Sequence, residues 1–296
     1  MPPIFAALSP APSSSDRRTQ ALRTHGRRVL LAILVLIALL LALAFVPEHA
    51  HATGSFVGPK TRYLALGDSL AFGFQPDLDW SHSYTKQWYN ELKNHGTSAF
   101  TDYGCNGETS ATFINGGCPY AYALHNYYLG SQLNAAVFYL NYYKGKVSPV
   151  SLDIGANDLL PDIDKSTCAV SSSWESDLAA LDSRLTGTIL PQLVAALTNS
   201  SGARTGDLVM MNYYDPYQNT CPNSLAYVQE LNSHLAADAA QFNVPIADVL
   251  TAFGGTATPN PNICPYTWMC SVFHDIHATD TGNGVIAGAF ESRTGY

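Results

Sequence analysis

Short apolar runs alternate with longer helix-like segments along most of this 296-residue chain, and that alternation constrains the fold more than any other feature. The apolar runs have the length and composition of buried strands and lie at 63–66, 99–103, 149–154, 207–212 and 244–247. Segments with helical spacing stand between or after them, at 83–95, 130–143, 173–197, 224–242 and 280–290. Strands that alternate with helices predict a parallel sheet covered by helices on both faces.

The first 52 residues differ from this pattern in composition. Residues 1–28 hold five arginines against one acid, and an unbroken apolar run follows at 29–45. The chain then reads Ala-His-Ala at 50–52, followed by small residues. A basic segment, an apolar segment and an Ala-x-Ala site are typical of an export signal. We therefore expect an export signal at 1–52, cleaved after Ala52, and a single secreted domain at 53–296.

Two alternatives concern this leader. The apolar run lies at the lower length limit of a membrane-spanning helix, so an uncleaved anchor is the first. The Arg27-Arg28 pair also leaves twin-arginine export open. In each case residues 53–296 face the outside. If the leader is cleaved, we expect no stable membrane partner and favour a monomer.

The charge of the exported part excludes some partners. Residues 1–52 hold five arginines and two acids, so their removal leaves 10 Lys and Arg against 21 Asp and Glu, a net charge of −11. Such an acidic surface disfavours nucleic acid and anionic membranes as partners.

All six cysteines lie in the exported part, where an even number favours disulfides. They are Cys105, Cys118, Cys168, Cys221, Cys264 and Cys270. Many pairings are open, but local closure favours Cys105–Cys118 and Cys264–Cys270, which leaves Cys168–Cys221. The spacings are irregular and contain no C-x-x-C pair, so they do not fit a metal site.

A serine follows the first predicted strand directly, in the sequence Gly67-Asp68-Ser69-Leu70. This position puts a hydroxyl at the carboxyl end of a parallel strand, where clefts form in open α/β sheets. A Gly-Asp-Ser turn is by itself a common connection between a strand and a helix. Its meaning depends on whether the chain also supplies a base for Ser69 and donors for an oxyanion.

Three further polar blocks follow predicted strands or stand in the last loop. They are YGCNGETS at 103–110, which contains Gly104, GAND at 155–158, which contains Asn157, and HDIHATD at 274–280, which contains His277. Singly, these residues could be a turn glycine, a helix N-cap and a structural histidine. Together with the serine block, and in this order, they resemble the GDSL or SGNH hydrolases.

The resemblance covers nearly all of 53–296 and implies a flavodoxin-like three-layer α/β/α sandwich. It implies that Ser69 is the nucleophile and His277 its base. The N–H groups of Ser69 and Gly104 and the side-chain amide of Asn157 would form the oxyanion hole. These residue types suit the chemistry, because an imidazole titrates near neutrality and neutral donors can stabilise a developing oxyanion. No metal or organic cofactor is implied.

The last block departs from the family pattern, which has an aspartate three residues before its histidine. His274 stands at that position here, and Asp275 lies only two residues before His277. Either Asp275 reaches the imidazole, or the backbone carbonyl near His274 holds the ring in a Ser-His dyad. The spacing slightly favours the carbonyl.

These residues predict a secreted serine hydrolase that cleaves carboxylic esters, with lipid or simple alkyl esters as the first expectation. A polysaccharide O-acetyl esterase, or a phospholipase or acyltransferase, could use the same site. A non-catalytic surface module that binds a glycan or a protein is the alternative from another class. Tyrosines crowd the loop after Gly104 and could form an aromatic wall for the substrate or simply pack that loop; they are Tyr120, Tyr122, Tyr127 and Tyr128.

Overall fold

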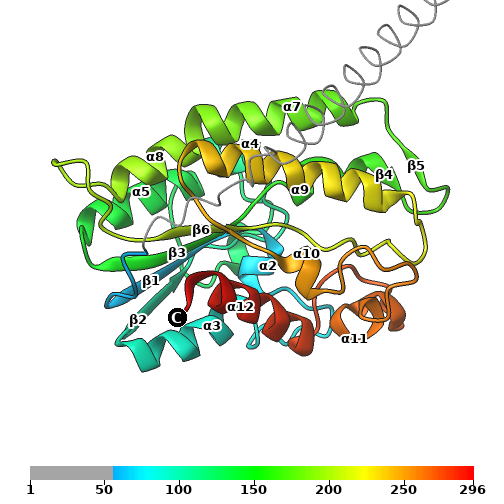
Figure 1. Cartoon of the computed structure of the whole chain (residues 1–296), viewed down its shortest axis with the longest axis horizontal. Coiled ribbons are helices and arrows are strands. Elements are labelled where there is room, and N and C mark those ends of the chain that lie inside the picture. Colours follow the sequence, from blue (N-terminus) through cyan, green and yellow to red (C-terminus); the bar gives the residue numbers. More distant parts are fainter. Residues whose placement is uncertain (1–55) are drawn as a thin grey trace, which may run out of the picture. The chain divides into compact units, whose positions relative to one another are not determined.

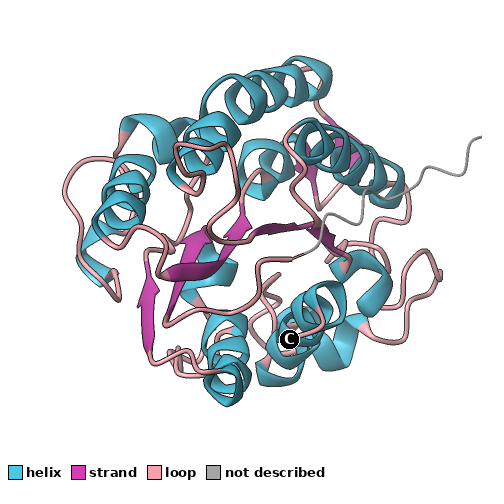
Figure 2. Ribbon diagram, turned by 60° about the vertical axis from the view of Figure 1, so that its left-hand side comes forward, coloured by secondary structure: helices cyan, strands magenta, loops and turns pink. Residues whose placement is uncertain are grey.

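The computed structural model describes residues 56–296, and in this part of the chain a five-stranded parallel sheet lies between two layers of helices (Figures 1 and 2). The strands are β1 (Arg62–Gly67), β2 (Ala99–Asp102), β3 (Val147–Asp153), β6 (Leu208–Met211) and β7 (Ile246–Ala247). They pair in parallel in the order β2-β1-β3-β6-β7. This is the strand order of flavodoxin-like folds, which confirms the expected three-layer α/β/α class.

Helices cover both faces of the sheet (Figure 1). One layer contains α3 (Tyr84–Leu92), α10 (Val249–Ala252), α11 (Ile263–Tyr266) and α12 (Asp280–Thr294). The other contains α4 (Ser110–Asn115), α5 (Gln132–Tyr142), α7 (Trp174–Arg184), α8 (Leu190–Ala196) and α9 (Ser224–Gln241). The central strand β3 is buried along its whole length, as expected for a parallel strand covered on both faces.

The structure refines several expected elements. The helix expected at 173–197 is divided into α7, a π-helical segment (Leu185–Ile189) and α8. Pro191 explains the interruption, because it has no N–H to donate and its ring crowds the preceding turn. A short antiparallel pair, β4 (Ile163–Asp164) with β5 (Ala169–Val170), was not expected.

Three disulfides cross-link the domain. They join Cys105 to Cys118, Cys168 to Cys221 and Cys264 to Cys270, which is the pairing that local closure favoured. Within residues 56–296, no helix combines the length and apolarity needed to cross a bilayer. The expected export signal at 1–52 lies outside the described residues and stays a prediction.

Two short helices mark the place where the sheet topology changes direction. The first, α2 (Ser69–Phe72), follows β1, and the second, α6 (Ala156–Leu159), follows the neighbouring strand β3. Ligands of open α/β sheets bind outside the carboxyl ends of strands at such a switch point. The serine block and the asparagine block therefore lie close together, at the carboxyl ends of neighbouring strands.

Candidate active site

Ser69 is the first residue of α2 and stands just beyond the carboxyl end of β1. Asp68 caps this helix, because its Oδ1 accepts the N–H of Leu70 at 2.9 Å. Gly67 has a φ of +143°, and a Cβ there would lie 2.5 Å from the Cγ of Asp153. The turn therefore requires glycine, and it leads the strand directly into the helix that begins with Ser69.

Ser69, His277 and Asp275 form a continuous hydrogen-bonded series. The Oγ of Ser69 lies 2.7 Å from Nε2 of His277, and Nδ1 of His277 lies 2.6 Å from Oδ1 of Asp275. If the hydroxyl donates to Nε2, the ring proton of the neutral imidazole is on Nδ1 and is donated to Asp275. Ser69 and the His277 side chain are only 7% and 14% exposed, so water screens the series little.

The carboxylate of Asp275, and not a carbonyl near His274, holds the imidazole. Asp275 Oδ1 also accepts the backbone N–H of His277 at 2.9 Å, in a local turn that folds the side chain back over the ring. His274 adopts a φ of +45°, which helps the chain make this turn. Among the described residues no carbonyl is bonded to the His277 ring, so the slight preference for the carbonyl was wrong.

The His277 interaction also affects the charge on Asp275. Burial by itself raises the pKa of the Asp275 carboxyl, but the hydrogen bonds from His277 and the attraction to its ring lower it more. The net result is a pKa below the ordinary value for an aspartate. Asp275 is therefore ionised at neutral pH, as required to stabilise a protonated imidazole.

Gly104 does not offer the free N–H that was expected of it. Its N–H is donated to Oδ1 of Asp102 at 2.8 Å, which leaves no hydrogen for an oxyanion. A Cβ at Gly104 would lie 2.4 Å from the backbone nitrogen of Phe72. Glycine is thus required at position 104 because the loop packs against the backbone of α2, and the expected oxyanion role is wrong.

Gly107 is the residue that the sequence reasoning missed. It is the third residue of a turn closed by a 3.0 Å hydrogen bond from Glu108 N to Cys105 O, and its φ of +80° favours glycine. In residues 56–296 the N–H groups of Gly107 and Ser69 have no hydrogen-bond partner. The amide of Asn157 donates to Glu108 O at 3.0 Å, so one of its two hydrogens stays free. An Asn-Gly pair inside a turn-rich block was the signal for this position.

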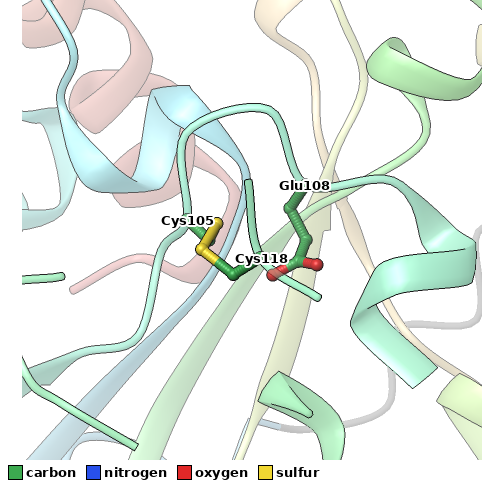
Figure 3. Close-up of side chains that lie close together, drawn as sticks. All are labelled: Cys105, Glu108 and Cys118. Atoms are coloured by element: carbon green, nitrogen blue, oxygen red, sulfur yellow. A yellow bond between two sulfur atoms is a disulfide. The ribbon is translucent and has the colours of Figure 1, made fainter. Parts of the chain in front are cut away.

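A buried carboxyl and a glutamine clamp this loop to the nucleophile turn. Gln132 accepts the N–H of Gly67 at 2.6 Å and donates to the carbonyl of Gly67 and to Glu108, both at 2.9 Å. Burial raises the pKa of Glu108. Figure 3 shows Glu108 close to Cys105 and Cys118, but these sulfur atoms are joined in a disulfide and so offer no thiolate ligands.

Two fully buried carboxyls lie behind Ser69. Oδ2 of Asp153 accepts the N–H groups of Asp68 and Ala71 at 3.1 and 3.2 Å, and its Oδ1 accepts the hydroxyl of Tyr84 at 2.5 Å. The other carboxyl, Asp68, accepts the hydroxyl of Tyr213 at 3.2 Å. Burial raises the pKa of Asp153 well above its ordinary value, and the negative charge of Asp68 raises it further.

A small apolar pocket opens beside Ser69, Asn157 and His277. Its cavity volume is about 40 Å³, and side chains from α9 and three loops supply its apolar wall: Leu160, Pro216, Val228, Leu231 and Ile276. One water needs about 10–15 Å³ on this scale, so the cavity holds about three groups of that size. In the described structure none of the four loop tyrosines lines this pocket, so the alternative in which they form an aromatic wall is not found here, and the tyrosines that do line it are Tyr213 and Tyr214.

Together the fold and the site define a flavodoxin-like α/β protein with a buried serine, its histidine and a supporting carboxylate. A family model for the GDSL-like lipase/acylhydrolase family matches residues 65–285, and the chain belongs to that family. It is thus a carboxylic ester hydrolase of the esterase or lipase type. A sequence comparison with curated proteins finds no match.

Solved structures support the fold assignment. The extracellular lipase of Streptomyces rimosus is 20% identical with a TM-score of 0.51, and the alignment covers 79% of this chain and 100% of the lipase. The phospholipase A1 of Streptomyces albidoflavus is 17% identical with a TM-score of 0.50 over 79% and 99% of the chains. An acetylxylan esterase from Geobacillus stearothermophilus is 15% identical with a TM-score of 0.53 over 81% and 96%.

Proposed function

We propose that this protein is an exported esterase that cleaves short-chain carboxylic esters through an acyl-enzyme on Ser69. The observation that carries the proposal is the series of 2.7 and 2.6 Å contacts from Ser69 through His277 to Asp275 at the mouth of an apolar pocket. Three of the similar structures are a lipase, a phospholipase and an acetylxylan esterase, and each of these enzymes is named for the cleavage of an acyl ester. Metal and cofactor roles have no place in the proposal.

The mechanism follows from the contacts around Ser69. His277 Nε2 takes the proton of the Ser69 hydroxyl as its oxygen attacks the acyl carbon, and Asp275 stabilises the imidazolium that results. The N–H groups of Ser69 and Gly107 and the free hydrogen of Asn157 stabilise the oxyanion, and each such donor is worth about 3–4 kcal/mol of barrier. His277 then gives its proton to the departing alcohol. A water activated by His277 releases the acid from Ser69.

The pocket volume sets the length of the acyl group. A cavity for about three water-sized groups fits an acetyl, propionyl or butyryl chain. Its apolar walls favour a hydrocarbon tail over a charged one. We therefore narrow the initial expectation of lipid or alkyl esters to short-chain esters.

A panel of p-nitrophenyl esters from acetate to laurate tests the proposal. We expect the highest kcat/KM at two to four carbons, and a covalent adduct of a fluorophosphonate on Ser69. Leu160→Ala widens the pocket wall and moves the optimum to longer chains, because Leu160 is half-buried and lines the cavity. Hydrolysis that survives in Ser69→Ala, or an optimum at laurate in the wild type, contradicts the proposal.

Export is the remaining part of the proposal. Three disulfides favour an oxidising compartment, since thiols stay reduced in the cytosol of most organisms. Mass spectrometry of the protein recovered from culture medium is expected to give a mature chain that begins at Thr53. Recovery of the uncleaved chain with the cell membranes would instead favour an anchor.

A further inference from the structure

A second hollow of about 400 Å³ lies along the outer edge of the sheet. Helix α3, the edge strand β2 and the loop at 118–130 enclose it. Its walls combine aromatic rings, side-chain amides and lysines, chiefly from Trp80, Lys86, Tyr89, Asn90, Lys93 and Asn126. We call this hollow the edge groove. Its volume lies within the range of about 300–1,000 Å³ that ligand sites occupy.

Two aromatic rings, Trp80 and Phe74, connect the edge groove to the imidazole of His277. The ring of Trp80 stacks at 6.3 Å on Phe74, and the ring of Phe74 lies 4.7 Å from that of His277. His125 also lines the groove, and its Nε2 lies 2.9 Å from the carbonyl of Phe72, the last residue of the helix that begins with Ser69. In an ester hydrolase the histidine delivers its proton to the departing alcohol. These ring contacts join the groove to the residue that protonates the alcohol.

The accessible charge in the groove is positive although the domain is acidic. Lys86 and Lys93 lie seven residues apart, so they face the same side of α3 and its 3-10 extension. Both are exposed, and no ion pair engages either of them within residues 56–296. The carboxyl of Asp102 is 2% exposed and accepts hydrogen bonds from Gly104 and Thr85. The two lysines are thus the charges that a ligand meets.

We propose that the edge groove binds an anionic saccharide chain that forms the alcohol part of the substrate, an inference that rests on the proposed function. Aromatic rings such as Trp80 pack against the C–H faces of sugar rings, and Asn90 offers both a donor and an acceptor to hydroxyls. Lys86 and Lys93 pair with carboxylates of the chain. An alkyl chain would leave the lysines and amides without partners, so the groove disfavours a lipid alcohol.

Binding can be measured without turnover in the Ser69→Ala protein. Isothermal titration calorimetry with oligogalacturonates of three to five residues supplies the anionic probe, and xylo-oligosaccharides of equal length supply the neutral one. We expect the anionic probe to bind more tightly and to weaken as salt is added. Adding Lys86→Gln and Lys93→Gln to this protein is expected to weaken its affinity for the anionic probe about tenfold, because two modest ion pairs are lost.

A matched control removes two lysines elsewhere. Lys144 and Lys146 are also exposed but lie at the amino end of β3, away from the groove. Lys144→Gln with Lys146→Gln makes the same charge change and is expected to alter the affinity less than twofold. Equal losses in both double variants would indicate a diffuse charge effect and overturn the inference.

Hydrolysis of p-nitrophenyl acetate distinguishes a failure here from a failure of the proposed function, because this substrate has no saccharide. We expect the control variant, Lys144→Gln with Lys146→Gln, to leave its kcat/KM unchanged. If the wild type hydrolyses the acetate but Ser69→Ala binds no saccharide, or binds the neutral chain equally well, the groove inference is wrong and the esterase proposal stands. If the wild type does not hydrolyse the acetate, the proposed function fails first.

Discussion

Replacing Asp153 tests whether its buried carboxyl holds the nucleophile turn. Asp153 accepts the N–H groups of Asp68 and Ala71, which flank Ser69 closely, and the hydroxyl of Tyr84. An asparagine has nearly the same shape and no charge. Its amide oxygen can accept the two N–H groups while its NH₂ donates to the oxygen of Tyr84. Alanine removes all three contacts.

The expected losses follow from these contacts. A buried donor left without a partner costs about 1–3 kcal/mol, so the loss of three acceptor contacts in Asp153→Ala is expected to lower the free energy of unfolding by about 3–9 kcal/mol. Asp153→Asn keeps the two N–H contacts but removes the acceptor of the buried Tyr84 hydroxyl, so it is expected to lower the free energy of unfolding by about 1–3 kcal/mol. The alanine variant also loses kcat, because the first turn of α2 is no longer held. Glu175→Gln, an exposed change on α7, is the control and is expected to shift stability by less than about 0.5 kcal/mol.

The pH dependence gives the sharper test. The pKa of Asp153 is higher in the folded than in the unfolded protein, so the folded state binds more protons at this group. Its contribution to stability therefore falls as pH rises above the unfolded value, and an asparagine does not titrate. Urea unfolding from about pH 5 upward should show the difference between Asp153→Asn and the wild type moving in favour of the variant. A difference that moves the other way would contradict the raised pKa of Asp153, and losses of equal size in the asparagine and alanine variants would contradict its role in holding the turn.

Three further predictions concern the active site and a disulfide. Asp275→Ala is expected to lower kcat on p-nitrophenyl acetate by about a thousandfold or more with little change in KM, and a loss below tenfold would restore the carbonyl alternative. Asn157→Ala is expected to lower kcat by about a hundredfold or more, because an oxyanion donor is lost. Gly104→Ala is instead expected to lower the thermal stability, because its Cβ meets the backbone of α2. Measuring both kcat and the thermal unfolding midpoint for each variant distinguishes the two effects. Removing the Cys168–Cys221 disulfide, whose partners lie 53 residues apart, is expected to lower the unfolding free energy by about 4 kcal/mol in urea titrations, and an unchanged midpoint would contradict the loop-entropy argument.

The parts of the site that a local pattern encodes could be predicted from the sequence. Ser69 follows a buried apolar run, and this alone fixes its place at the carboxyl end of a parallel strand. The alternation of strands and helices likewise predicts the parallel sheet and its two helical layers. His277 needed the whole set of blocks, because a single histidine in a loop has no local signature. In each case the information lies within a few consecutive residues or in their order along the chain.

Backbone geometry and long-range packing decided the rest. Asp275 reaches the imidazole through a local turn in which its Oδ1 also accepts the backbone N–H of His277, and the residue spacing does not reveal this turn. The choice between Gly104 and Gly107 depends on which N–H a neighbouring side chain already occupies. Leu231, in the pocket wall, lies on a helix face where a substrate-binding leucine and a core leucine look the same in sequence.

The two hollows divide the proposed substrate at its scissile bond, and both adjoin the helix of four residues that begins with Ser69. The pocket beside Ser69 and Asn157 limits the acyl group by volume, whereas the edge groove selects the alcohol by charge and hydrogen bonding. Volume and charge are independent, so changes in one hollow should leave selectivity in the other unaltered. Leu160→Ala should then change the preferred acyl length equally for phenyl and saccharide esters. Lys86→Gln should act only when the alcohol is a charged saccharide.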